Sequence, residues 1–469
     1  GHSRGRPPNV YWFNPNCEVE TGQPDASTPK TAVAELAADL ETLPSFLAGT
    51  DDLVVVRSAP APEFLSRLVA AGLNPPEFLV TADGAPAMSA HATIGELRPW
   101  GWSPHTQRKL ARLGKLSPDG PMITVDLQSP ARRELISKAW AASVLRDLSA
   151  DAGWPDWWTG PTAPAMVVTE PGAAQAAVGQ LLQTHDTVVV KSPYSTSGRD
   201  TLRLNRVPID GVPTAGVPTA GATLGWIERQ LAKQGHLLVE PWLRNVANLS
   251  ALLTVPKHGR PRLLGTTRFF TNRAGQYQGT LLGRATTGLP NSIQRWLTDS
   301  GHEPRRLMTA IERTVNLVGR RLSESGYAGP AGIDMLVEQT DDTASTVHAT
   351  PYRLKPIVEV NVRFTMGHVA LNLARHCAPG TTGLWLLVPI RQLQKCGYES
   401  AAAFDEAARQ LAPLQTNGGL DPKWRRGVLP TNDPGVATQV QSFVVAGESW
   451  VDCQRQVETL GLEWPDITS

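Results

Sequence analysis

In the first 150 residues, short runs of branched apolar residues alternate with segments of helical periodicity. Three strands are predicted, at 9–14, 53–57 and 77–80. Helices are predicted at 32–43, which Pro44 ends, and at 62–72, where Phe64, Leu65, Leu68 and Val69 have helical spacing. This order of strand, helix and strand favours a parallel sheet with helices on its faces.

The pattern continues after residue 165 with shorter units. Strands are predicted at 165–168, 187–190 and 237–240, and helices at 171–182 and 222–234. A longer helix is expected at 306–325, where Leu307, Ile311, Val315, Val318 and Leu322 form one stripe. Between these two parts, residues 151–161 are rich in glycine, proline and tryptophan, and we expect exposed turns at a domain boundary.

Composition narrows the possible classes of protein. The 469 residues have room for about three domains. The 44 Lys and Arg against 43 Asp and Glu give no overall field for nucleic acid or an anionic membrane, so neither partner is expected. No apolar run is long enough to span a bilayer, and the four cysteines are far apart. We therefore expect a cytoplasmic protein with neither a zinc site nor a disulfide framework.

The most specific motif lies in the segment 356–367, which follows a second strand-like segment at 332–337. Side chains alternate along a strand, so Glu359, Asn361 and Arg363 are expected on one face. The three valines, Val358, Val360 and Val362, are expected to pack on the other face. One face of the strand therefore carries the candidate chemistry.

Oxygen ligands on these two segments indicate a magnesium site. Asp334, Glu359 and Asn361 offer two carboxylates and an amide oxygen, a set that suits Mg²⁺ completed by water and phosphate. Arg363 would neutralise a transferring phosphoryl group. The alternative is that all four are solvent-facing residues of an ordinary amphipathic hairpin.

Two upstream segments suit a nucleotide. Lys191 ends a strand and is followed by a loop of hydroxyl residues and glycine at 192–200, which can present an ammonium group and backbone N–H groups to phosphates. It has neither the P-loop nor the dinucleotide-fold spacing, and its alternative is a hairpin turn. The strand at 237–243 breaks at Pro241 and leaves backbone groups free for a planar ligand edge, or it is simply a strand end.

From residue 151 onward, the order of these motifs resembles that of the ATP-grasp family of ADP-forming ligases. Residues 1–150 resemble the pre-ATP-grasp domain that precedes the ATP-grasp lobes in that family. The resemblance implies an α/β (α+β) fold in which an N-terminal βαβ domain, 1–150, precedes two lobes, 151–236 and 237–469. The nucleotide would lie between these lobes.

The resemblance also implies roles for individual residues. Lys191 would reach the ATP phosphates, and the loop of Ser195, Ser197, Gly198 and Arg199 would close over them. Glu240, Trp242 and Leu243 would form the hinge that reads adenine. Asp334, Glu359 and Asn361 would hold the metal, Arg363 would be the arginine of the E-x-N-x-R signature, and Arg268 would face the acyl phosphate. The strand 165–168 lacks the lysine that many members have, so that phosphate contact is missing or supplied elsewhere.

The expected activity is that of an ATP-dependent ligase that joins a carboxylate to an amine through an acyl phosphate, with ATP and Mg²⁺ or Mn²⁺. Amino acids or a short peptide are the expected substrates, and a homodimer the expected assembly. The alternatives are a phosphotransferase acting on a hydroxyl group and a non-catalytic nucleotide-binding protein. The sequence leaves open the substrate pair and the base for the attacking amine.

Two further motifs have competing interpretations. Trp100 and Trp102 could stack on an acceptor substrate, but packing between domains is favoured. His368 could accept a proton from the amine, but a helix cap is favoured.

Overall fold

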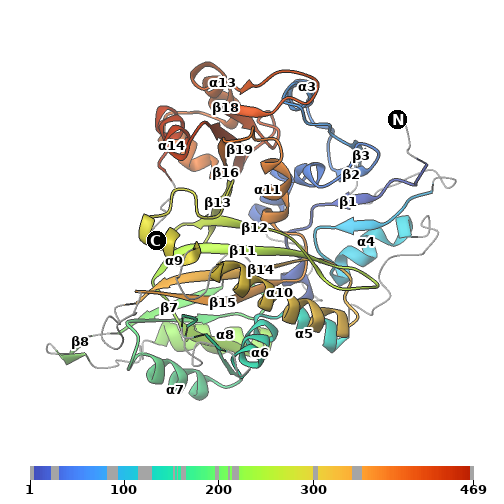
Figure 1. Ribbon diagram of the computed structural model, residues 1–469. Helices are drawn as coiled ribbons and strands as arrows, with labels where there is room; N and C mark the ends of the chain where they lie inside the picture. The colour runs from blue at the N-terminus through green and yellow to red at the C-terminus, as the bar shows by residue number, and fades with distance from the viewer. Residues whose placement is uncertain are drawn as a thin grey trace.

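The computed structural model of the protein (Figure 1) describes residues 5–22, 31–81, 93–114, 129–150, 154–155, 157–159, 165–195, 200–206, 208–209, 212–213, 221–298, 305–340 and 351–464. Ser197, Gly198 and Arg199, predicted to cover the phosphates, lie outside the described residues. So does most of the segment 151–161.

The N-terminal part contains the expected parallel sheet. Its strands are β1 (Val10–Trp12), β2 (Leu53–Val56), β3 (Glu77–Val80) and β4 (Leu97–Pro99), in the order β3-β2-β1-β4. The helices are α1 (Cys17–Gly22), α2 (Thr31–Asp39), α3 (Pro62–Ala70) and α4 (Pro104–Gly114). The helix predicted at 32–43 is shorter than expected, because it ends at Asp39 and Pro44 lies in a separate 3₁₀ turn, η1 (Leu43–Phe46).

A small antiparallel sheet follows two helices, α5 (Pro130–Ile136) and α6 (Lys138–Ser149). It is built from β5 (Met166–Val168), β6 (Thr187–Lys191), β7 (Thr201–Asn205) and β10 (Leu237–Pro241), in the order β5-β10-β6-β7. Helices α7 (Pro171–Leu181) and α8 (Gly221–Gln234) supply apolar side chains to one core with these strands, including Val178, Val190 and Ile227. A short ribbon, β8 (Pro208–Ile209) with β9 (Val212–Pro213), lies between β7 and α8 in the chain.

The largest sheet has nine strands, in the order β15-β14-β11-β12-β13-β16-β19-β18-β17, and every neighbouring pair is antiparallel. Its strands are β11 (Asn245–Val255), β12 (Arg262–Thr271), β13 (Tyr277–Leu282), β14 (Gly329–Gln339), β15 (Tyr352–Asn361), β16 (Thr382–Pro389), β17 (Gln415–Thr416), β18 (Trp424–Pro430) and β19 (Val440–Gly447). Its helices are α9 (Asn291–Thr298), α10 (Arg306–Glu324), α11 (Met366–Ala374), α12 (Ile390–Lys395), α13 (Ala401–Leu411) and α14 (Trp450–Thr459). Helix α10 confirms the helix predicted at 306–325. These sheets and their helices confirm the mixed α/β class.

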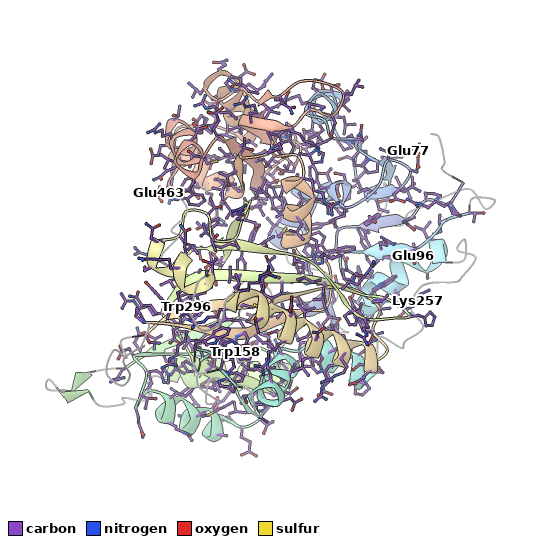
Figure 2. The ribbon with its side chains drawn as sticks, viewed as in Figure 1. Glu77, Glu96, Trp158, Lys257, Trp296 and Glu463 are labelled. Atoms are coloured by element: carbon purple, nitrogen blue, oxygen red, sulfur yellow. The ribbon has the colours of Figure 1, made fainter. Side chains whose placement is uncertain are left out.

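The tryptophan segment was predicted as exposed turns, and for its described residues this was wrong. Trp157 and Trp158 are 6% and 1% exposed, and they belong to one core with α6, α10 and β14. Trp158 also forms a parallel bridge with Leu354 of β15. Figure 2 shows Trp158 and Trp296 of α9 in the lower half of the molecule, and Trp296 meets Trp157 edge to face at 6.2 Å. Burial of these large rings outweighs the local preference for turns.

The N-terminal part of the chain packs against strand β19 of the large sheet and the segment just before it. The buried carboxylate of Asp39 accepts hydrogen bonds from the backbone N–H groups of Thr438, Gln439 and Val440. Trp100 is 3% exposed, packs edge to face on Phe13 at 4.8 Å and shares one core with Trp385 and Val444 of the large sheet. This confirms the packing between separate parts of the chain that was favoured for Trp100. The division of the chain near residue 150 stays a prediction, because α6 contributes to the core of the large sheet.

Candidate active site

A pocket lies between the small sheet and the edge strand β15 of the large sheet, and we call it the interlobe pocket. It contains about 350 Å³ of space, part of which is open to solvent. It is lined by Lys138, Ala142, Leu145, Ala165, Lys191, Leu238, Glu240, Lys355, Ile357, Val358 and Glu359. Three lysines and two glutamates therefore converge from α6, β6, β10 and β15.

Glu240 connects the two sides of this pocket. Its carboxylate pairs with Lys191 of the small sheet and with Lys355 of β15, whose Nζ is 2.6 Å from Oε2. Burial by itself would raise the pKa of Glu240, but the two lysines outweigh it and lower that pKa to about 2. The predicted site residues Lys191 and Glu240 are thus in direct contact, and the sequence reasoning missed Lys355.

Lys138 is the third lysine and was also missed. It is the first residue of α6, and its Nζ is 2.7 Å from Oε1 of Glu359. The same ammonium group donates to the carbonyl oxygen of Ser195. No lysine occupies the strand 165–168, but the structure brings this one to the pocket from the preceding helix. No periodicity in the sequence distinguishes it from the other lysines on helices.

The residues predicted to form the hinge lie where the chain passes from β10 of the small sheet, which contains Glu240, to β11 of the large sheet. Trp242 and Leu243 follow β10 and precede β11, and the backbone N–H of Trp242 donates to the carbonyl oxygen of Thr187. The indole ring of Trp242 is covered by the Arg203 guanidinium, 3.4 Å from the ring centroid. Their predicted contact with adenine stays a prediction.

The carboxylates predicted to hold a metal do come together. Strands β14 and β15 place Asp334 opposite Glu359, and Asn361 Nδ2 donates to Asp334 Oδ2 at 3.0 Å. Arg363 Nη2 donates to Asn361 Oδ1 at 3.0 Å, so all four residues form one group. Burial, followed by the negative charge of Glu359, raises the pKa of Asp334 to about 7.

The alternation predicted for β15 holds only in part. Val360 and Val362 belong to the core behind the sheet, as expected. Val358, however, lines the interlobe pocket beside Glu359. The pairing with β14 shifts between Asp334 and Leu336, and this irregularity breaks the strict alternation of faces.

This group suits a divalent cation by its chemistry. Two carboxylates and an amide oxygen match the donors that Mg²⁺ takes from proteins. A cation would offset the burial and the repulsion from Glu359 that together raise the pKa of Asp334. Among the described residues, no group of three or more His, Cys, Asp or Glu side chains could hold a metal ion. A cation here would need phosphate or water oxygens in addition.

Arg363 also contacts the N-terminal part of the chain. Its Nε is 2.7 Å from Glu18 Oε1 and its Nη2 is 3.2 Å from Glu18 Oε2, although 345 residues separate the two. Burial would lower the pKa of Arg363, but the adjacent Glu18 carboxylate outweighs it and raises that pKa. Glu18 was missed, because its only sequence signal is its position just after the first strand.

Arg268 is not part of the group, contrary to the expectation that it faces an acyl phosphate. Its neighbour Thr267 pairs with Ser250, which pairs with Asp334, so Arg268 lies on the opposite face of the sheet. There it is buried between the rings of Phe270 and Trp450, and it donates to the carbonyl oxygen of Thr287. Burial lowers the pKa of Arg268 to about 10.

The side chains of Ser195 and His368 both form local hydrogen bonds. The hydroxyl group of Ser195 donates to the carbonyl oxygen of Ser192, so it is turned toward its own backbone. His368 forms a capping box with Thr365 at the start of α11, and burial lowers the pKa of His368 to about 4. This confirms the helix cap for His368.

Comparison with known proteins gives a fold resemblance alone. No family model matches the chain, and no curated protein matches it. One similar structure is the biotin carboxylase domain of 2-oxoglutarate carboxylase from Hydrogenobacter thermophilus with MgADP, ADP and bicarbonate. It is 13% identical with a TM-score of 0.48, and the match covers 98% of this chain and 90% of that chain.

Two other similar structures are synthases of N5-carboxyaminoimidazole compounds. The enzyme from Staphylococcus aureus with ADP is 9% identical with a TM-score of 0.47, covering 97% of this chain and 96% of its own. The enzyme from Aspergillus clavatus with ADP and 5-aminoimidazole ribonucleotide is 14% identical with a TM-score of 0.46. The match covers 89% of this chain and 99% of that chain. These neighbours are ATP-grasp enzymes, the superfamily that the chain resembles in sequence.

Proposed function

We propose that the protein is an ADP-forming ligase that activates a small carboxylate with ATP and joins it to an amine. The observation that carries this proposal is that Glu359 belongs both to the lining of the interlobe pocket and to the candidate metal-binding group. The lysine-lined interlobe pocket ends at Glu359, and Glu359 lies opposite Asp334 in the group that includes Asn361 and Arg363. A cationic pocket for phosphates is thus adjacent to oxygen ligands for a metal.

In this proposal, Lys138, Lys191 and Lys355 bind the phosphates of ATP. Each is held by a carboxylate, Glu359 or Glu240, and an incoming phosphate would compete for the ammonium groups. Lys138 then supplies the phosphate contact that the strand 165–168 lacks. The segment after β10, with Trp242 and Leu243, would contact the adenine ring.

Asp334, Glu359 and Asn361 would hold Mg²⁺, which supplies charge neutralisation to a phosphoryl group in transfer. Arg363 would offset the charge that accumulates when the carboxylate oxygen and the γ-phosphoryl group approach each other. The carboxylate oxygen then forms a bond to phosphorus, ADP leaves, and an acyl phosphate results. An amine attacks the acyl carbon, loses a proton and releases inorganic phosphate.

The test is to measure ADP formation with hydroxylamine in place of the amine. A ligase forms an acyl hydroxamate, because hydroxylamine attacks the acyl phosphate. A phosphotransferase, the alternative, makes ADP and a stable phosphate ester with no hydroxamate. If every acid that stimulates ADP formation gives no hydroxamate, the ligase proposal is wrong.

The substrate class, the alternative metal ion and the state of assembly are also proposed. Amino acids or a short peptide are the proposed substrates, with Mn²⁺ as an alternative ion, and a homodimer stays a prediction. The four cysteines are unpaired, and a cytoplasmic location stays a prediction. No helix in the described part of the chain is long and apolar enough to cross a membrane.

A further inference from the structure

The contact between Arg363 and Glu18 is the part of the site that the activation step does not require. Glu18 is buried, with its side chain 6% exposed, and Arg363 is 15% exposed. Both nitrogens that bond Glu18 belong to the guanidinium group that also bonds Asn361. A carboxylate from the N-terminal part thus lies directly against the arginine of the metal-binding group.

The position of Glu18 in the parallel sheet is one that suits a ligand. Strand β1 has β2 on one side and β4 on the other, so the chain leaves β1 at the point where strand order reverses. In open parallel sheets, ligands bind beyond the carboxyl ends of the strands at this point. Glu18 follows the carboxyl end of β1, and Gly101 and Ser103 follow that of β4.

The residues around Glu18 hold it in place. Asn14 Nδ2 donates to the carbonyl oxygen of Gly101 at 2.7 Å, which joins the two strand ends. The carbonyl oxygen of Trp100 accepts from the N–H of Phe364 at 2.8 Å, which joins the segment after β15 to the residue after β4. The carboxylate is therefore fixed beside Arg363 by the fold.

Charge balance then indicates what binds here. When Arg363 engages an anionic substrate group, Glu18 loses hydrogen bonds from its cationic partner while it stays buried. An unpaired buried carboxylate is unfavourable, so a substrate that brings its own cation is favoured over one that does not. An α-amino acid brings both charges, a carboxylate for Arg363 and an ammonium group for Glu18.

We infer that Glu18 binds the α-ammonium group of an amino acid whose carboxylate is the one activated at Arg363. This inference rests on the proposed ligase function. It makes the amino acid the acyl donor, since an ammonium group held by Glu18 keeps its proton and has no lone pair for attack. The amine that forms the new bond must come from a second molecule.

The experiment compares acyl donors in the hydroxamate assay with the full chain, ATP and Mg²⁺. The donors are the twenty proteinogenic L-amino acids, D-alanine, and for each its des-amino and N-acetyl counterparts. We expect kcat/KM at least tenfold higher for one or more amino acids than for the counterparts. In Glu18→Gln the KM for the amino acid rises about 10- to 100-fold and the preference falls to within about threefold, with the KM for ATP unchanged.

Glu20→Gln is the matched control. Glu20 is two residues away on α1 and bonds the hydroxyl group of Ser103 rather than Arg363, so the preference for an amino group is retained. Glu18→Asp keeps the charge on a shorter side chain and restores part of the preference. The comparison of donors with the unmodified chain needs no variant, so it stands even where Glu18→Gln does not fold.

Three results would overturn the inference in different ways. Equal turnover of amino acids and their des-amino counterparts would contradict the role of Glu18 in binding an ammonium group and would leave the ligase function intact. A preference that persists in Glu18→Gln would assign the ammonium group to another residue. Absence of hydroxamate from every acid would contradict the proposed function, and the inference would fail with it.

Discussion

Lys138 and Glu359, 221 residues apart in the chain, form a 2.7 Å ion pair that joins the first turn of α6 to the edge strand β15. If Lys138 binds phosphate, Lys138→Met should raise the KM for ATP about 10- to 100-fold, the effect of losing a charged hydrogen bond. Steady-state kinetics with varied ATP measures it. Lys233→Met, at an exposed position on α8, should leave the KM unchanged.

If Asp334 holds the metal, removal of its carboxylate should abolish turnover while ATP still binds. Asp334→Asn keeps the size of the side chain but removes one of two opposed carboxylates, and we expect the rate of ADP formation to fall more than 100-fold. Because the cost of burying this charge and its repulsion from Glu359 both disappear, the metal-free variant should be at least as stable as the unmodified chain at pH 8. Chelator-treated samples in a urea titration would measure this, and a large loss of stability would contradict it.

The Glu240 group should be sensitive to the loss of one lysine. Lys355→Met leaves a buried carboxylate with Lys191 as its partner, and we expect a loss of about 2–3 kcal/mol in the free energy of unfolding. Adding Glu240→Leu removes the buried charge, so the double variant should lose less than the sum of the two single losses. Urea unfolding of all four proteins forms the cycle, and additive losses would show that the pair is not coupled.

His368 should make the fold sensitive to mild acid. Its pKa is lowered by burial to about 4 in the folded protein, against 6.5 for an ordinary histidine, so the unfolded chain binds the proton first. The contribution of neutral His368 to the free energy of unfolding is complete above pH 6.5 and is lost as the pH falls through 4. The loss amounts to roughly 3 kcal/mol in all. His368→Asn keeps a cap acceptor without this titration and should flatten the dependence. His258→Asn, on an exposed loop, should not.

Gly101 should tolerate no side chain. A Cβ there would lie 2.3 Å from the Cys17 sulfur and 3.1 Å from Arg363 Cβ. Gly101→Ala should therefore displace Glu18 and Arg363 and lower kcat/KM about tenfold or more. Cys17→Ala in addition should restore part of the loss. Gly172→Ala in α7, where no atom lies within 4 Å, should keep full activity.

Short-range patterns predicted much of this structure. The strand predicted at 77–80 is present as β3, and the helix predicted at 306–325 follows from an apolar periodicity that burial of one helix face produces. The group around Asp334 could be found because antiparallel strands bring alternate residues into register. Strand pairing places Asp334, Glu359 and Asn361, whereas Arg363 follows the end of β15 and is held by Glu18 and Asn361.

The residues that were missed depend on contacts between distant segments. Lys138, Lys355 and Glu18 reach the site through the packing of α6, the shifted register of β15 and the docking of the parallel sheet. Arg268 was misplaced, because its face of the sheet is set by a pairing with β11 that no local pattern reveals. Trp157 and Trp158 were assigned to turns because their partners on α10 and β15 come nearly 150 residues later or more.

The hydrogen bonds from Thr438, Gln439 and Val440 to Asp39 connect residues about 400 positions apart. At a synthesis rate of about 5–20 residues per second, the ribosome needs roughly 20–80 s to make the chain between them. Throughout that interval the first sheet exists without the strand it docks against, and its apolar side chains, such as Phe13 and Leu68, lack part of their core. Newly made chains are therefore exposed to aggregation for most of their synthesis, and production of the protein in cells should depend on chaperones that bind the nascent N-terminal part.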